Sequence, residues 1–199
     1  MSTPQFEQAL RSIDEANAQD PTKVEIGGEA VPYELFYSRE VTKWVKRLSP
    51  DASPELLLAA RCQHICRWEI PRSTYPMTRP GYLKWRTDLK KFHAEKAAAI
   101  LGAAGFSPES IARVRSLNLK ENLGSDAELQ VLEDALCLVT LEHQLADLMR
   151  KTEPEKLITI LQKTWKKMSP AAHEVALTLD YTPEQKEVLG RALAPDPES

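Results

Sequence analysis

The stretch SPELLLAARCQHICRWEIP at residues 53–71 decides the fold class. Ser53 offers a side-chain oxygen for the N-cap of a helix, and Pro54 suits the first helical position because its missing N–H would have no partner there. The run that follows continues to Pro71, whose ring forbids an interior helical hydrogen bond. The stretch therefore predicts one long helix that ends before Pro71.

The same start signal recurs along the chain. Ser/Thr-Pro pairs stand at residues 3–4, 107–108, 169–170 and 182–183. Together with apolar stripes of helical period, they predict an all-α bundle of about seven to nine helices. VEIGGEAV at 24–31 differs, because Gly-Gly between two short alternating runs predicts a β-hairpin. No Gly/Ser-rich or Pro-rich linker divides the chain, so we expect a single helical domain over residues 1–199.

Composition narrows the class of protein further. Apolar residues make up 42% of the chain, which is enough for a core, and the sequence shows no signal peptide or apolar run of about 18 residues. We therefore expect a soluble, cytoplasmic protein without a membrane span. The formal net charge of −3 argues against general nucleic-acid binding. Three cysteines are an odd number, which favours buried thiols over disulfides.

Residues 61–96 combine positive charge with aromatic rings. They hold nine Lys/Arg and three Asp/Glu, which leaves six positive charges, and four Trp/Tyr. Guanidinium groups bind planar anions bidentately and stack on aromatic faces, so this mixture predicts a site for a phosphate ester or nucleotide. The residues expected to line it are Gln63, Arg67, Arg72, Tyr75, Arg79, Tyr82 and Arg86. The alternative is a structural ion-pair network with the acidic segment 121–155.

Three motifs resemble the HD-domain phosphohydrolases, whose helical bundle holds one or two divalent metals. AARCQH at 59–64 resembles that family's Ala-Ala-Leu-Leu-His-Asp segment. FHAEKAAAILGAAGFSPESIARV at 92–114 resembles its next metal helix, and LEDALCL at 132–138 resembles its Asp-Ala-Asp-x-Leu segment. The resemblance implies an HD-like core over residues 35–140, with C-terminal helices at 152–195 packed on it.

The same resemblance implies a divalent metal ion and a set of site residues. Mn, Fe, Co or Zn would suit the ligands, which would be His64, His93 and Asp134. Glu133 and Lys120 are the candidate catalytic residues beside them. The chain departs from the HD pattern at three places, which reduces the ligand set. Tyr37 or Ser38 replaces an initial histidine, His64 stands at the aspartate position, and Lys120 stands where some members have histidine.

A second resemblance covers most of the chain. The chain is similar to an uncharacterised family sometimes labelled glutamyl-tRNA synthetase-like. The similar segments are RCQHICRWEIPR, GYLKWR, FHAEK, LEDALCLV and KTWKKMS. This family implies no activity, and the sequence contains neither a Rossmann pattern nor a class-I synthetase signature.

Two functions of different class follow from these patterns. The first is a metal-dependent hydrolase, in which a metal-activated water attacks a small phosphorylated or nucleotide substrate. The second is a non-catalytic module that recognises a nucleotide, an RNA segment or an acidic partner through the same basic and aromatic residues. A small anionic or phosphorylated ligand is the favoured partner, and nucleic acid is the less favoured one.

Overall fold

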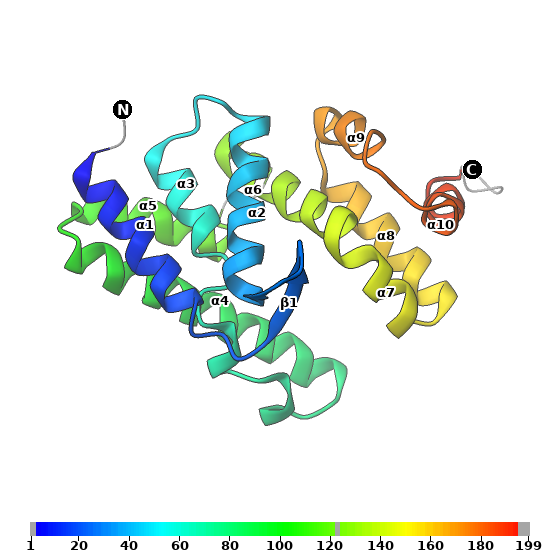
Figure 1. Cartoon of the computed structure of the whole chain (residues 1–199), viewed down its shortest axis with the longest axis horizontal. Coiled ribbons are helices and arrows are strands. Elements are labelled where there is room, and N and C mark those ends of the chain that lie inside the picture. Colours follow the sequence, from blue (N-terminus) through cyan, green and yellow to red (C-terminus); the bar gives the residue numbers. More distant parts are fainter. Residues whose placement is uncertain (1–2, 122–123, 195–199) are drawn as a thin grey trace. The chain divides into compact units, whose positions relative to one another are not determined.

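A computed structural model describes residues 3–121 and 124–194 of the chain (Figure 1). The described residues form ten α-helices and one two-stranded antiparallel sheet, so the all-α prediction is confirmed. Contacts within the chain divide it into two compact units, residues 1–132 and residues 133–199. The expectation of one domain over the whole chain stays a prediction.

The first unit contains five helices, the hairpin and the first turns of a sixth helix. Its core holds the fully buried side chains of Ile13, Trp44, Leu58, Leu101 and Leu117. Helix α4 packs against α5, and α2 packs against α3. The elements are α1 (Pro4–Asn17), β1 (Lys23–Ile26), β2 (Glu29–Pro32), α2 (Tyr33–Leu48), α3 (Pro54–Arg61), α4 (Arg79–Ala103) and α5 (Pro108–Leu119), followed by α6 (Ala127–Val139), which crosses into the second unit.

Side-chain caps explain where these helices begin. The hydroxyls of Thr3, Ser53 and Ser107 each accept a hydrogen bond from the backbone N–H three residues later. A proline occupies the first turn in each case, where its missing N–H costs no bond. The start of α4 follows the same rule, since the Thr78 hydroxyl accepts from the N–H of Gly81 at 3.2 Å. The helix therefore begins at Arg79.

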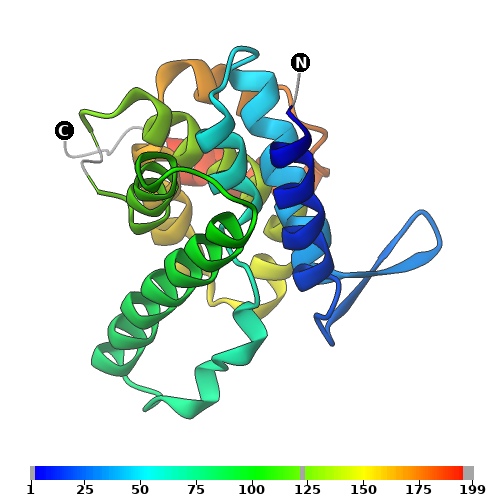
Figure 2. The same ribbon diagram turned by 90° about the vertical axis from the view of Figure 1, so that its left-hand side faces the viewer.

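The predicted hairpin is present. Strands β1 and β2 pair with Val24 opposite Val31, and Gly27 and Gly28 form the turn with positive φ angles of 60° and 86°. Figure 2 shows the hairpin extending away from the helices of the first unit. The described helices include none that is long and apolar enough to cross a membrane.

The second unit begins inside α6 and is also helical. A π-helical segment (Thr140–Gln144) joins α6 to α7 (Leu145–Lys151). Helices α8 (Pro154–Lys167) and α10 (Pro183–Leu193) pack against each other, and the short α9 (Pro170–Ala176) lies between them in the chain.

The prediction of one long helix over residues 53–71 is wrong in its second half. Helix α3 ends at Arg61, and Cys66 adopts the left-handed conformation with φ of 53°. Two other helices take the backbone groups that a longer helix would have used. The Asn17 side chain of α1 accepts from the N–H of Cys66 at 3.4 Å, and the His93 ring of α4 bonds the carbonyl of Ile65 at 2.8 Å. Tertiary contacts therefore replace helical ones here.

Candidate functional site

The irregular segment after α3 brings His64 and Arg67 together. Arg67 Nη1 lies 3.1 Å from His64 Nε2, and a guanidinium can only donate, so this imidazole nitrogen accepts. The His64 ring stacks on Tyr37 of α2 with centroids 4.4 Å apart and planes 6° apart. Burial, followed by the positive charges of Arg67, Arg86 and Lys120, lowers the pKa of His64 well below its usual value. His64 is therefore a neutral imidazole near pH 7.

His93 lies on α4 beside His64, with ring centroids 5.9 Å apart. Its Nδ1 lies 2.8 Å from the carbonyl oxygen of Ile65, which fixes the proton on Nδ1 because a carbonyl can only accept. Nε2 then carries the lone pair, and it is buried without a hydrogen-bond partner. Burial lowers the pKa of His93 to about 4. The rings of the two predicted histidines are therefore neighbours.

Glu34 is a site residue that the sequence reasoning missed. It lies in the first turn of α2 and is 5% exposed, and its Oε2 lies 3.5 Å from His64 Nδ1 without forming a hydrogen bond. Because His64 is neutral, this close approach is not an ion pair. Burial raises the pKa of Glu34 to about 8, although Arg67 opposes the rise. One signal was present in the sequence: Glu34 is three and seven residues before Tyr37 and Val41, on the buried face of α2.

A pocket of about 190 Å³ opens beside these groups. We call it the Arg67 pocket, and its lining includes Tyr33, Glu34, Arg67, Trp68, Arg72 and Trp85. The guanidinium carbon of Arg67 lies 5.0 Å from the centre of the Trp85 ring, and that of Arg72 lies 6.0 Å from it. Trp85 itself is fixed because its indole N–H donates to the carbonyl of Ile70 at 2.9 Å. The pocket thus combines a cation–π wall with a buried carboxyl group.

The other predicted ligand-binding residues have more varied environments. Arg72 donates to the carbonyls of Tyr75, Pro76 and Thr78, so it holds the loop before α4 as well as lining the pocket. Gln63 donates to Asn118 at 2.8 Å and is buried. The remaining four lie as follows: the Tyr75 hydroxyl donates to Asp88, the Tyr82 ring is 5.9 Å from Trp85, and Arg79 and Arg86 are exposed.

Two of the predicted catalytic and metal residues lie in the second unit. Asp134 is buried, and its two oxygens accept from the N–H of Ser169 at 2.8 Å and from its hydroxyl at 2.6 Å. These bonds anchor the segment that starts α9. Glu133 is buried on the same helix. Lys120 ends α5 in the left-handed conformation, and its charge contributes to the low pKa of His64.

Two of the three residues predicted to bind a metal already use donor atoms within the chain. Of the three, His64 gives its Nε2 lone pair to Arg67, and Asp134 gives both oxygens to Ser169. His93 keeps an unpartnered Nε2. The cationic groups that hold the pKa of His64 low would also repel a divalent ion. The metal site stays a prediction, and no catalytic step through a metal follows from this arrangement.

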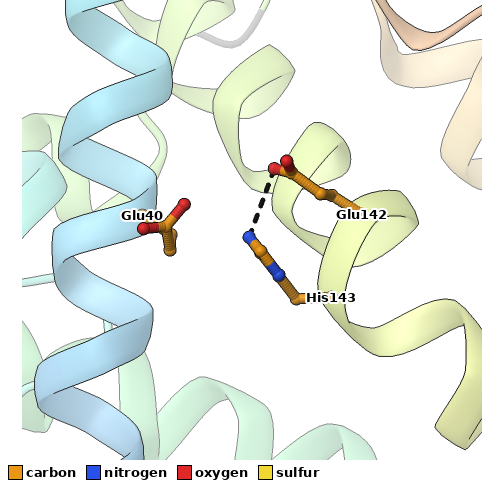
Figure 3. Close-up of side chains that lie close together, drawn as sticks. All are labelled: Glu40, Glu142 and His143. Atoms are coloured by element: carbon orange, nitrogen blue, oxygen red, sulfur yellow. Dashed lines mark ion pairs between the residues drawn. The ribbon is translucent and has the colours of Figure 1, made fainter. Parts of the chain in front are cut away.

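Among the described residues of the second unit, a histidine and a carboxylate lie close together. His143 Nε2 lies 3.2 Å from Glu142 Oε2 on the π-helical segment, and both side chains are partly exposed (Figure 3). Figure 3 also draws Glu40, which belongs to α2 of the first unit. A partly exposed pair of this kind contributes at most about 1 kcal/mol, so we interpret it as a surface contact.

Comparison with known proteins places the chain in a family. The model of the domain of unknown function DUF4202 matches residues 7–189. The chain belongs to the DUF4202 family. No curated protein and no solved structure matches it. The expected membership of an uncharacterised family is thereby confirmed, whereas the HD-like arrangement of this DUF4202 chain stays a prediction.

Proposed function

We propose that this chain binds a small phosphorylated anion in the Arg67 pocket. The proposal rests on the position and the contacts of Arg67. Its guanidinium lines the pocket, lies over Trp85 and donates to the neutral His64. Among the described residues, no carboxylate lies within ion-pair distance of it. A cation in a partly dry pocket with no acidic partner is well placed to bind an anion from solution.

Charge and size support the same ligand class. Arg72 lines the pocket beside Arg67, and Arg86 adds a positive field at both histidines. Burial keeps Glu34 neutral near pH 7, so it does not cancel that field. The volume of about 190 Å³ is below the roughly 300 Å³ at which pockets for drug-sized ligands begin. A short phosphate ester therefore suits the pocket better than a nucleotide or an RNA segment.

Replacement of Arg67 by glutamine tests this proposal. We expect inorganic phosphate and ethyl phosphate to raise the melting temperature of the parent protein, and the Arg67→Gln variant to bind them at least about tenfold more weakly. A charge-assisted bond in a partly dry pocket exceeds the ~0–1 kcal/mol of an exposed ion pair. Isothermal titration calorimetry gives the Kd values, and differential scanning fluorimetry gives the melting temperatures.

Two further variants separate binding from stability. Arg11→Gln removes an exposed arginine of α1 and should leave both Kd and melting temperature unchanged. Arg72→Ala should lower the melting temperature even without ligand, because it removes three hydrogen bonds to the loop before α4. The proposal is wrong if neither phosphate nor ethyl phosphate binds the parent protein, or if Arg67→Gln binds them as the parent does.

Metal-dependent hydrolysis of the same ligand is the second candidate, and the unpartnered Nε2 of His93 is the observation that favours it. Metal analysis of the purified protein tests this candidate. A transition metal bound in equal molar amount, and lost in His93→Ala, would support hydrolysis. A metal-free protein that still binds ethyl phosphate would support the binding function alone.

A further inference from the structure

Most polar groups that line the Arg67 pocket have partners within the chain. Both oxygens of Asp20 accept from backbone N–H groups, those of Thr22 and Glu34, each at 2.9 Å. Arg72 donates to three carbonyls, and the Trp85 indole donates to a fourth. These groups are satisfied by the fold, so they set the shape of the pocket without requiring a ligand.

A basic group and an acidic group in the same pocket, Arg67 and Glu34, each lack a partner of opposite charge in the described part of the chain. Arg67 has one bond, to a neutral imidazole, and no carboxylate partner among the described residues. Glu34 has a buried Oε2 with no hydrogen-bond partner, and it is 95% buried overall. Both residues line the pocket, yet no ion pair joins them. A buried carboxyl group without a partner is costly, and it is seldom kept unless something outside the chain satisfies it.

The neighbours of Glu34 do not supply the missing cation. His64 is closest: its Nε2 accepts from Arg67, so Nδ1 carries the proton and faces Glu34 Oε2 at 3.5 Å, but this N–H is uncharged and forms no hydrogen bond with it. Asp20 carries the same sign of charge as an ionised Glu34 and raises its pKa. Tyr37 stacks on His64 and has a pKa raised far above neutrality, so it is neutral as well. Arg67 acts on Glu34 only through its field.

From this geometry we infer that the ligand carries an ammonium group for Glu34 in addition to the anionic group for Arg67. The inference rests on the proposed function and names the ligand class more narrowly, as a short aminoalkyl phosphate or a similar zwitterion. The ammonium donates to the Glu34 carboxylate, and the phosphoryl oxygens accept from the Arg67 guanidinium. Tyr33, Trp68 and Trp85 then enclose the short carbon chain between the two ends.

The size of the pocket is consistent with this ligand. A volume of about 190 Å³ leaves room for two charged ends joined by a few carbon atoms. Glu34 is protonated in the free pocket near pH 7, and it releases this proton when the ammonium group binds, because a nearby cation favours the ionised carboxylate.

A pair of matched ligands tests the inference. Ethyl phosphate and O-phosphoethanolamine differ by the ammonium group alone. We expect the parent protein to bind O-phosphoethanolamine at least about tenfold more tightly near pH 7, because a charge-assisted hydrogen bond forms in a partly dry pocket. In the Glu34→Gln variant this preference should fall below about twofold, since an amide keeps the shape of the carboxyl group but not its charge. Isothermal titration calorimetry of the four combinations gives the ratios.

The control variant is Glu15→Gln, which removes an exposed carboxylate of α1 and should keep the tenfold preference. The affinities of the parent protein for the two ligands already test whether an ammonium group strengthens binding. This part of the test does not depend on the folding of any variant. Equal affinity of the parent for both ligands would overturn the ammonium inference while leaving phosphate binding intact. If neither ligand binds, the proposed function itself fails. A preference that survives in Glu34→Gln would also overturn the role of Glu34.

Discussion

The Glu34→Gln variant is expected to be more stable than the parent protein, and its advantage should grow as the pH rises from 5 to 8.5. Burial raises the pKa of Glu34 from 4.5 to about 8. The folded state therefore holds this proton more tightly than the unfolded state does. The contribution of Glu34 to stability is fully present below pH 4.5 and is lost as the pH rises through 8. Glutamine cannot ionise, so the variant escapes this loss.

The size of the effect follows from the shift in pKa. Each unit corresponds to about 1.4 kcal/mol, and relaxation of the site reduces the total to on the order of 3 kcal/mol at pH 8.5. For a chain of this length, 1 kcal/mol changes the melting temperature by roughly 2–4 °C, so the variant should melt about 6–12 °C higher. At pH 5 the two proteins should differ by about 1 kcal/mol or less.

Thermal melts of both proteins over this pH range measure the difference. His93, whose pKa is lowered to about 4, destabilises both proteins as the pH falls below 6.5, and its effect cancels when the two are compared. Glu15→Gln serves as the control and should follow the parent at every pH. A difference that is constant with pH, or a variant that melts below the parent, would show that Glu34 has a partner or is ionised in the folded protein.

Stability and binding are expected to oppose each other at Glu34. The unpartnered carboxyl group destabilises the free protein, and the same group gives the Arg67 pocket its preference for an ammonium ligand. A residue that costs free energy in the absence of ligand is typical of a binding site. The two Glu34→Gln experiments therefore belong together, because a purely structural glutamate would not gain stability and lose ligand preference in the same variant.

The fold was largely predictable because its signals are local. Ser53-Pro54 and Ser107-Pro108 begin helices through bonds to residues within one turn, and the glycines of the hairpin act within four residues. The end of α3 was not predictable in the same way. It depends on Asn17 and His93, which are far away in the sequence and take the backbone groups near Cys66.

The candidate site was predicted in part for the same reason. The cluster of basic and aromatic residues indicated Arg67, Arg72 and the tryptophan wall, because they lie close together in the chain. Glu34 lies about thirty residues earlier, and only the fold brings it to His64 and the pocket. Asp134 looked like a ligand because it is an acid on an apolar helix, but its role depends on Ser169, in a segment whose contacts the sequence does not show.

Gly81→Ala is expected to destabilise the protein by about 2 kcal/mol, although alanine is normally the better helix former by about 1 kcal/mol. A Cβ atom at Gly81 would lie 2.1 Å from the carbonyl oxygen of Pro76, which is a backbone atom and cannot rotate away. The same carbonyl accepts a 2.7 Å hydrogen bond from Arg72. The added methyl group must therefore displace the loop before α4 and weaken the contacts that hold Arg72 beside the pocket.

Gly102→Ala in the same helix is the matched control and should have the opposite sign. A Cβ atom there would meet only the Ile111 side chain, at 4.0 Å, so the gain in helix propensity remains and should stabilise the protein by about 0.5–1 kcal/mol. Urea unfolding of both variants measures the two free energies. Because the substitutions are chemically identical, a shared sign would mean that propensity rather than the contact with Pro76 controls Gly81. Opposite signs, with weaker phosphate binding in Gly81→Ala alone, would show that the start of α4 supports the pocket through Arg72.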